Sequence, residues 1–521
     1  MKKGEILEGT VEQLQFPNRG ILHVEGKKAV VKDVIPGQKI RFCVKKNRTD
    51  RIEGQLLEVT EKAPYELPEP TCPHFGICGG CAYRNLTYEK QLELKGQQMI
   101  QLLGLNGFQV RLCDADAAGS AGKAEGSFAD GILNVWASPA ACGHRNKMEF
   151  TFGDEYKGGP LSLGMHKQGG FYDIINVPQC RNVDEDFRRI LSAVREFFAE
   201  RGVPYYHRMR HDGILRHLLV RKAYATGEIL VDLAAASELA SQTQPDGTPM
   251  LQAFCTMLRA LPLKGTLSGV LYTRNDSPAD TITDEGTQIL YGRDFITEEL
   301  LGLRFHITPF SFFQTNSRGA EVLYTQVRRM IGTLRDDPVV FDLYSGTGTI
   351  AQMVAPSAGK VIGVEIVPEA VAAARENAAL NGLSNCEFLC GDVLGVLDEI
   401  PERPDFIILD PPRDGVHPKA LKKIMDYGVP QMVYISCKPT SLVRDLEVLH
   451  AGGYEVQDIC CVDMFPYAAH IETVCLLSNR KCVSSERSLL DFVNLKPDAY
   501  VDLSLDMEDY RRIKAEEADR N

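Results

Sequence analysis

The sequence predicts a multidomain α/β protein whose C-terminal part is a doubly wound parallel sheet. The chain has 521 residues, which is too many for a single hydrophobic core. After residue 305, apolar strand-like runs alternate with helical patterns, as is typical of βαβ units. Residues 1–60, in contrast, hold only short strand-like runs separated by turn residues, which is typical of a small β-barrel of the OB type.

The N-terminal barrel is expected to be basic. Five strands are predicted, over residues 4–14, 20–24, 27–31, 39–46 and 51–59. Residues 1–60 hold twelve Lys and Arg against eight Asp and Glu, although the whole chain carries a net charge of -12. Nucleic-acid binding follows the local potential, so the barrel is a candidate RNA-binding face. The alternative is a small β-domain without that role.

The middle of the chain is predicted to be an α+β domain, over residues 61–304. Its expected elements are a Pro-rich linker over residues 64–73, helices over residues 88–103 and 187–201, and strands over residues 227–233 and 269–273. Residues 113–131 are mostly small and polar, which predicts a surface loop insertion. The charged tail over residues 481–521 has no readable motif.

The composition indicates the cellular compartment in which we expect the protein. No run of about 18 apolar residues is present, so no membrane span is expected. The chain has fifteen Cys and no apolar run near its start that would serve as a secretory signal. We therefore expect a cytoplasmic monomer, whose cysteines serve a metal or catalysis before disulfides.

A Gly-rich turn marks a cofactor site. A predicted strand over residues 339–344 leads into Ser345-Gly-Thr-Gly-Thr349, where the glycines allow a tight turn and close ligand approach. The next strand ends in Glu365, which can accept hydrogen bonds from ribose hydroxyls, and Asp392 follows a third strand near the expected adenine. The pattern predicts a nucleoside-type cofactor. NAD is disfavoured because Ala351 interrupts its Gly-x-Gly-x-x-Gly fingerprint.

A thiol follows the last two predicted strands of this sheet, over residues 406–409 and 432–436. Asp410 ends the first of them and Cys437 the second, so both lie at the edge where ligands bind. Lys438 is expected to lower the pKa of the Cys437 thiol. A thiolate beside S-adenosylmethionine (SAM) indicates methylation of an electron-poor ring carbon after covalent attack.

That chemistry also needs a base. Thiolate addition at C6 of uracil makes C5 nucleophilic, and the C5 proton must then be removed. Glu472, just before an apolar strand, is the candidate. On spacing alone, a Glu at such a position is more often simply solvated.

Three cysteines lie in the spacing Cys72-x5-Cys78-x2-Cys81, and Cys180, in a polar Pro-containing turn, is the best fourth ligand. Four thiolates suit either zinc or a [4Fe–4S] cluster. Zinc usually takes paired ligands, so the uneven set favours the cluster. Scattered free thiols are the alternative.

Together these motifs resemble the uracil-C5 RNA methyltransferases of the RumA and TrmA kind, over nearly the whole chain. The resemblance implies an N-terminal TRAM domain of the OB-like type and a Rossmann-like SAM methyltransferase domain over residues 305–480. It places Cys72, Cys78, Cys81 and Cys180 on the ligands of a [4Fe–4S] cluster. It implies Cys437 as nucleophile, Glu472 as base, and a SAM site lined by Gln314, Tyr344, Thr349, Glu365, Asp392 and Asp410.

The resemblance also suggests phosphate or structural contacts for Arg145 and Lys147. Two departures, Ser345 and Thr349 where the family commonly has Cys and Asn, remove no catalytic group. The iron–sulfur branch implies 5-methyluridine formation in 23S ribosomal RNA, with tRNA as the alternative substrate.

Three other activities are weighed against this one. An exocyclic-amino methyltransferase would need an aromatic residue after Asp410-Pro-Pro, where Arg413 stands. A radical-SAM enzyme would need a Cys-x3-Cys-x2-Cys loop, which residues 72–81 do not match. A non-catalytic RNA-binding module would bind RNA without methyl transfer.

Overall fold

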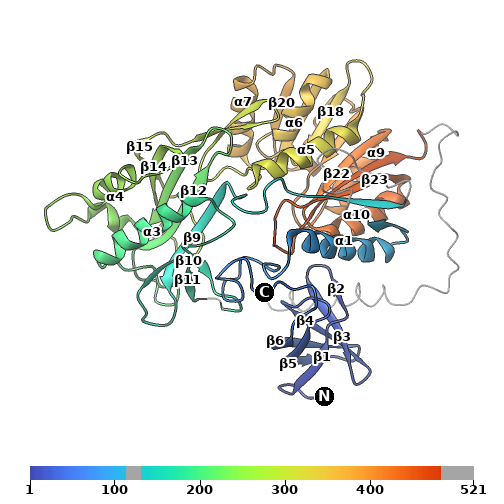
Figure 1. Cartoon of the computed structure of the whole chain (residues 1–521). Helices are drawn as coiled ribbons and strands as arrows, with labels where there is room; N and C mark the ends of the chain where they lie inside the picture. The colour runs from blue at the N-terminus through green and yellow to red at the C-terminus, as the bar shows by residue number, and fades with distance from the viewer. Residues whose placement is uncertain (113–130, 171, 483–521) are drawn as a thin grey trace. The chain divides into compact units, whose positions relative to one another are not determined.

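The computed structural model describes residues 1–112, 131–170 and 172–482. The predicted insertion over residues 113–131 and the predicted tail over residues 481–521 fall almost entirely outside the described residues. Three large sheets and one hairpin make up the fold (Figure 1).

The N-terminal sheet is a six-stranded half-barrel with the strand order β1-β5-β6-β4-β3-β2. Its strands are β1 (Ile6–Thr10), β2 (Gln13–Gln15), β3 (Arg19–Val24), β4 (Lys27–Lys32), β5 (Lys39–Asn47) and β6 (Arg51–Glu61). The single strand predicted over residues 4–14 is wrong, because the chain bends at buried Val11, whose N–H donates to the carbonyl of Gln38 (2.8 Å). The hydrophobic core of this half-barrel is separate from those of the other sheets.

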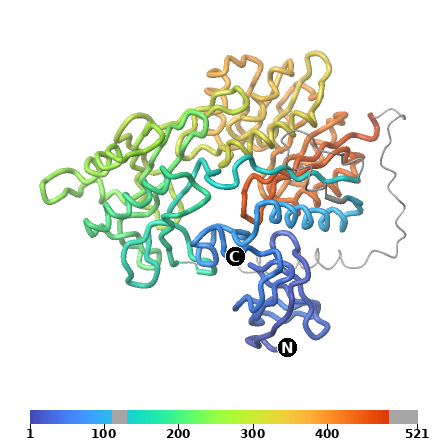
Figure 2. Tube along the Cα trace, in the orientation of Figure 1, coloured from blue at the N-terminus to red at the C-terminus, as the bar shows by residue number. Residues whose placement is uncertain are grey.

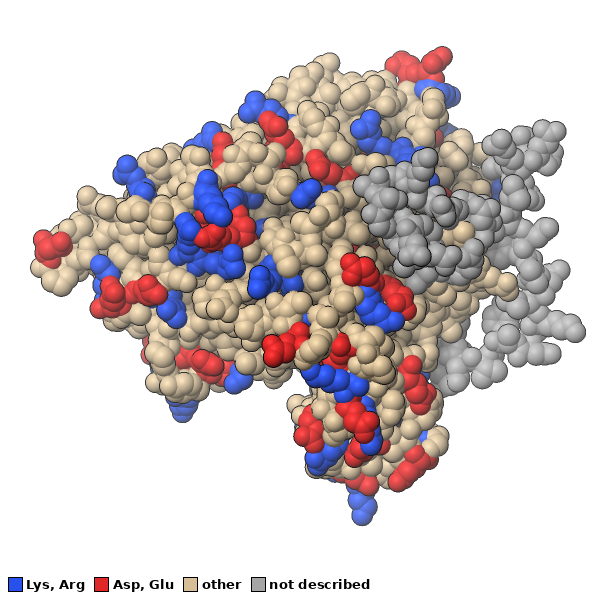
Figure 3. All heavy atoms as spheres, viewed as in Figure 1, with Lys and Arg blue, Asp and Glu red and all other residues tan. Residues whose placement is uncertain are grey.

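Acids balance many of the barrel's cations. Arg41 pairs with Glu58 on the neighbouring strand, and Lys39 pairs with Glu8 (3.2 Å) and Glu61 (3.1 Å). On the face drawn in Figure 3, basic and acidic side chains are correspondingly intermixed over this part of the molecule. Any RNA-binding surface of the barrel must therefore depend on the smaller set of cations that lack such partners.

The middle sheet has seven strands in the order β11-β10-β9-β12-β13-β14-β15. The strands are β9 (Lys147–Asp154), β10 (Leu161–His166), β11 (Ile174–Asn176), β12 (Leu215–Lys222), β13 (Glu228–Ala235), β14 (Thr266–Arg274) and β15 (Thr287–Gly292). Helices α3 (Glu185–Glu200) and α4 (Met250–Arg259) share one apolar core with one face of this sheet. A hairpin, β16 (Ile296–Leu300) and β17 (Leu303–Ile307), follows it.

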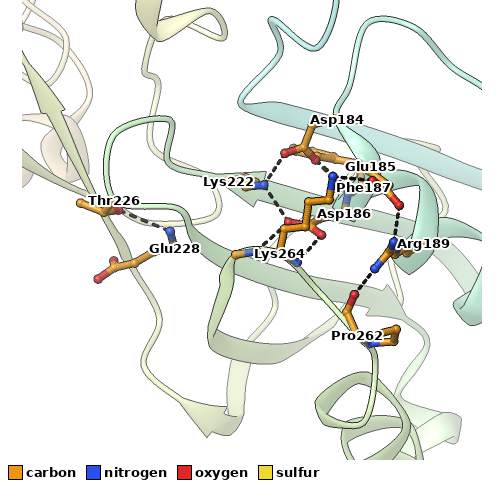
Figure 4. A network of polar contacts seen from close by, with 11 residues as sticks. Asp184, Glu185, Asp186, Phe187, Arg189, Lys222, Thr226, Glu228, Pro262 and Lys264 are labelled. Carbon is orange, nitrogen blue, oxygen red and sulfur yellow. Dashed lines mark hydrogen bonds and ion pairs between the residues drawn. The ribbon is translucent and has the colours of Figure 1, made fainter.

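A buried ion-pair network ties the start of α3 to this sheet (Figure 4). Asp184 caps the helix by accepting from the amide of Asp186 (3.0 Å), and Lys222 at the end of β12 contacts both carboxylates. Asp186 also accepts from the amide of Lys264 (2.8 Å). Because Asp186 is only 1% exposed, its charge requires these donors, and they fix the helix against the strand ends.

The C-terminal sheet has nine strands in the order β20-β19-β18-β21-β22-β24-β23-β8-β7. Its strands from the C-terminal half are β18 (Val339–Leu343), β19 (Lys360–Glu365), β20 (Cys386–Cys390), β21 (Phe406–Leu409), β22 (Gln431–Ser436), β23 (Tyr454–Val462) and β24 (Glu472–Asn479). Strands β18 to β22 pair in parallel, as predicted, whereas β24 is antiparallel to β22 and to β23.

Helices cover both faces of this sheet, as a doubly wound fold requires. One core contains α5 (Ser317–Ile331), α6 (Thr349–Val354) and α7 (Pro368–Leu380). The other contains α1 (Tyr88–Gly104), α8 (Val393–Val396), α9 (Pro418–Asp426) and α10 (Pro439–Ala451). The predicted Rossmann-like architecture is therefore confirmed.

The predicted boundaries of the central domain do not follow the sheets. Strands β7 (Arg111–Leu112) and β8 (Ile132–Trp136) complete the nine-stranded sheet, because β8 pairs in parallel with β23 (Figure 2). Helix α1 packs on the same sheet. Residues 61–304 thus contribute to two sheets, a long-range pairing that local sequence patterns do not contain.

Among the described helices, none is both long and apolar enough to cross a membrane.

Candidate active site

The Gly-rich turn joins β18 to α6. Gly348 has φ +72°, and a Cβ there would lie 2.6 Å from the ring of Phe388, so a side chain at this position would be both strained and blocked. Thr349 is the first residue of α6 and is buried. The amide of Gly346 donates to Glu365 (3.0 Å), which fixes the predicted ribose acid against the turn.

A small pocket lies beside this turn. It is lined by Tyr344, Asp392, Leu394, His417 and Ala420. Asp392 caps α8 by accepting from the amide of Leu394 (2.9 Å). The structure therefore brings together two predicted cofactor residues, Tyr344 and Asp392, and adds His417, which the sequence did not indicate.

Gln314 lies in the loop between β17 and α5, and the middle sheet holds that loop. Asn146 donates from its side chain to the carbonyl of Gln314 (2.8 Å) and from its amide to the carbonyl of Thr315 (2.9 Å). The buried guanidinium of Arg221, on β12, donates to the carbonyls of Pro309 (3.1 Å) and Ser311. Asn146 therefore has a structural role, beside Arg145 and Lys147 in the motif.

The loop that contains Gln314 also contacts α5 and the Gly-rich turn between β18 and α6, which is called the cofactor turn below. Thr347 donates to the carbonyl of Phe312 (3.3 Å). Asn316 caps α5 by accepting from the amide of Gly319 (3.0 Å). These contacts place Gln314 between the cofactor turn and the first turn of α5.

Cys437 and Glu472 meet at the carboxyl edge of the C-terminal sheet. Ser436, which precedes Cys437, pairs in register with Thr473, which follows Glu472, because β22 and β24 are antiparallel neighbours. Burial raises the pKa of the Cys437 thiol, Glu472 and Asp410 raise it further, and Arg413 opposes them. The charges of Glu472, Asp410 and Arg413 therefore all act on the Cys437 thiol at this edge.

Glu472 is 4% exposed and belongs to a set of buried carboxyls. Burial, followed by the charge of Asp410, raises the pKa of Glu472 to about 8, and Arg413 counters the shift. Burial alone raises the pKa of Asp410 to about 7. Both carboxyls are therefore buried rather than solvated at the surface, and raised pKa values of this kind are typical of functional sites.

The predicted role of Lys438 is wrong. Its ammonium lies 3.6 Å from the exposed carboxylate of Asp414, and the pKa of Cys437 is raised rather than lowered. Arg413 is the cation that favours the thiolate. Arg413 directly follows Pro411 and Pro412 in the sequence, and only its distance to the thiol in the folded chain identifies this role.

A further carboxyl, Asp342, was missed. It is fully buried within β18, burial followed by Asp410 raises its pKa to about 8, and it accepts from the amide of Ala351 (2.9 Å). Its other oxygen has no hydrogen-bond partner among the described residues. An acid inside an otherwise apolar strand was the signal that could have identified it.

The four predicted metal-binding cysteines line one pocket, between the 72–84 loop and the turn after β11. Burial, and then Cys81, Cys180 and Cys72, raise the pKa of Cys78 to about 11, opposed by the amide of Gly80. That amide donates to the Cys78 sulfur (3.4 Å), and Asn182 donates to the Cys81 sulfur (3.3 Å). Within the described ranges, no group of three or more His, Cys, Asp and Glu side chains is arranged to hold a single metal ion.

The comparisons with known proteins identify the family. A family model described as a methyltransferase domain matches residues 334–487. An RNA methyltransferase of Clostridium tetani is 46% identical over 477 residues, covering 91% of this chain and 98% of that protein. One of Clostridium acetobutylicum is 45% identical over 480 residues, covering 92% and 99%. The chain belongs to the RNA methyltransferases.

A solved structure supports the fold of this RNA methyltransferase. The tRNA (uracil-54, C5)-methyltransferase of Pyrococcus abyssi, in complex with S-adenosyl-L-homocysteine, matches with a TM-score of 0.67 at 23% identity. The match covers 90% of this chain and 100% of that chain. The predicted membership in an RNA methyltransferase family is thus confirmed, and the methyltransferase domain supports SAM as its cofactor.

Proposed function

We propose that this RNA methyltransferase converts a uridine in structured RNA to 5-methyluridine, with Cys437 as nucleophile and Glu472 as base. The observation that carries the proposal is the convergence of a thiol, two buried carboxyls and a guanidinium beside the Gly-rich turn. An exocyclic-amino methyltransferase has no use for Cys437. An RNA-binding module has no use for buried acids whose pKa values are shifted toward neutrality.

The residues support a covalent reaction sequence. SAM supplies an electrophilic methyl group. The Cys437 thiolate, favoured by Arg413, adds to C6 of uracil, and the electron pair that develops at C5 takes the methyl group. The Glu472 carboxylate then removes the C5 proton, the C5–C6 double bond re-forms, and the Cys437 sulfur leaves. Burial makes Glu472 basic enough for this task near neutral pH.

The cofactor residues support a SAM site along the same edge. Glu365, which accepts from the amide of Gly346, is the proposed ribose ligand, and Tyr344 and Asp392 line the pocket proposed for adenine. Asp410 follows β21, which lies between β18, the strand before the Gly-rich turn, and β22, the strand before Cys437. Gln314 and Thr349 complete the proposed set at the start of α5 and α6.

The cysteine-lined pocket supports a [4Fe–4S] cluster held by Cys72, Cys78, Cys81 and Cys180. The four cysteines surround one pocket, as the four thiolate ligands of a four-iron cube would. Amide donors to two of the sulfurs, and Arg84 and Arg145 nearby, suit the negative charge of such a group. When bound, the cluster would cross-link the 72–81 loop to Cys180.

The iron–sulfur motif favours 23S ribosomal RNA over tRNA as the substrate. The decisive experiment is methylation in vitro of ribosomal RNA and of tRNA, each isolated from a strain that lacks the gene. Nucleoside mass spectrometry should detect 5-methyluridine in the 23S RNA, and primer extension should map it. Methylation of an exocyclic amine, or of neither RNA, would refute the proposed function.

A further inference from the structure

A strained residue precedes the proposed base in the chain. Tyr467 has φ +63°, which is unusual for a residue other than glycine, and it is 6% exposed. It lies five residues before Glu472, in the segment that connects β23 to β24. A buried side chain keeps such a backbone conformation only where the surrounding structure holds it.

The 72–84 loop, called the cysteine loop because it contains Cys72, Cys78 and Cys81, makes several of the contacts that stabilise this conformation. The carbonyl of Tyr467 accepts from the amides of Ala82 (2.7 Å) and Tyr83 (3.2 Å), the two residues that follow Cys81. Its own amide donates to the side chain of Gln91 on α1 (2.6 Å). Both backbone groups of the strained residue are therefore bound by one stretch of the N-terminal half.

Arg84 links the ring of Tyr467 to the cysteine pocket. Its guanidinium lies 3.9 Å from the centre of the Tyr467 ring, and Arg84 also lines the pocket. It donates to Asn182 (2.6 Å), whose amide group in turn donates to the Cys81 sulfur (3.3 Å). A continuous set of contacts therefore runs from a proposed cluster ligand to the segment that ends at Glu472.

The start of the same segment is fixed independently. Asp463 forms a fully buried ion pair with Lys95 on α1 (2.6 Å) and accepts from Gln91 (2.8 Å). Asn316, the cap of α5, donates to the carbonyl of Met464 (3.0 Å). The segment is also held by Lys95, which donates to the carbonyl of Phe465 (3.0 Å), and by Ile471, which is buried in the core of the sheet. Tyr467 is the residue at which the segment contacts the residues that follow Cys81.

We propose that Tyr467 and Arg84 are positioning residues that fix Glu472 against the substrate and make its placement depend on the folded cysteine loop. This inference rests on the proposed function. Neither residue touches the reacting atoms. The cysteine pocket would thereby contribute to proton removal without contacting the cofactor turn.

The test uses four full-length variants: Tyr467→Phe, Tyr467→Asn, Arg84→Gln and the double variant Tyr467→Asn with Arg84→Gln. Asn tolerates the left-handed conformation, so Tyr467→Asn removes the ring and keeps the backbone. For Tyr467→Asn we expect kcat to fall about 10- to 100-fold, with the KM values for SAM and for RNA unchanged. A SAM-dependent protein–RNA adduct should persist, as expected for Glu472→Gln. Iron content should match that of the wild type, and the variant should remain folded at the assay temperature with a lower melting temperature, because a buried ring is lost.

Two controls separate positioning from folding. Tyr467→Phe keeps the ring and the backbone and should behave as the wild type. The double variant should be no slower than the slower single variant, because both changes interrupt one set of contacts. Wild-type kcat in Tyr467→Asn, or a loss of kcat that accompanies loss of iron or of folding, would overturn the inference.

Failure of the underlying function gives a different result. If Glu472→Gln forms no SAM-dependent adduct and releases methylated RNA normally, another group removes the C5 proton and the proposed role of Glu472 is wrong. The split between kcat and KM in Tyr467→Asn then still decides whether that residue positions the site.

Discussion

Release of the methylated RNA should depend steeply on pH, because the proposed base is a buried acid. The perturbation is a change of pH from 6 to 9 after the adduct between Cys437 and RNA has formed. Burial and Asp410 raise the pKa of Glu472 to about 8. Methyl transfer converts the positively charged sulfonium of SAM to a neutral thioether, so SAM no longer contributes a positive charge near Glu472. In the adduct, the groups that interact with Glu472 are Asp410, Cys437 and Tyr324, and the positive charge of Arg413 opposes the effect of Asp410.

The magnitude follows from the ionised fraction of Glu472. A carboxyl with this pKa is about 1% ionised at pH 6, about 10% at pH 7 and about 90% at pH 9. Only the carboxylate can take the C5 proton, so the rate of adduct decay should rise about tenfold per pH unit below 8 and then level off. An exposed Glu, ionised above its ordinary pKa, would give a constant rate over the whole range.

The assay is a chase experiment. Labelled RNA and SAM are mixed with the enzyme for one turnover, the pH is changed, and the adduct is quantified on denaturing gels. Glu472→Gln should give a long-lived adduct with no such pH dependence. A wild-type decay rate that is constant from pH 6 to 9 would refute the assignment of Glu472 as a buried base.

Three further predictions test the other parts of the molecule. Cys437→Ala should reduce turnover below about one part in 10³ and leave SAM affinity unchanged in calorimetry, whereas a change at exposed Cys482 should alter neither turnover nor SAM affinity. Anaerobically purified protein should hold roughly four irons per chain with visible absorption; Cys180→Ser should lose both, and Cys255→Ser, buried in the middle core, should keep them. Arg19 and Lys32 are exposed and directly opposite each other on β3 and β4, with no acidic partner among the described residues. Changing both to Gln should weaken RNA binding and reduce its salt slope by about two, whereas Arg41→Gln, which breaks a pair with Glu58, should leave that slope unchanged.

Sequence patterns predicted those parts of the fold and site that depend on neighbours along the chain. Strands β18 and β21 end where the apolar runs end, so Asp410 and the Gly-rich turn could be placed at one sheet edge. The positions of β7, β8 and α1 could not be predicted. Strand β8 pairs with β23, more than 300 residues away, as in the pairing of Val135 with Cys461, and β7 joins the sheet through β8.

The electrostatics of the site were predicted less well than its position. Lys438 is adjacent to Cys437 in sequence, yet its side chain turns toward Asp414. Arg413, 24 positions away, is the cation that acts on the thiol. Charges act through distance and burial, and neither follows from adjacency in the sequence.

The proposed reacting groups all belong to the C-terminal sheet, but the side chains that fix their surroundings come from the first half of the chain. Lys95 on α1 neutralises the buried Asp463, Asn146 and Arg221 hold the loop of Gln314, and Arg84 contacts Tyr467. A buried ion or guanidinium that loses its partner costs more than a surface contact, so these residues cannot be separated from the sheet without loss of stability. The first half of the chain also carries the cysteine pocket and the middle sheet. A substitution in either of them therefore affects the proposed active site through the residues that hold it in place. The isolated C-terminal half would therefore keep the cofactor turn and still lack a correctly placed base.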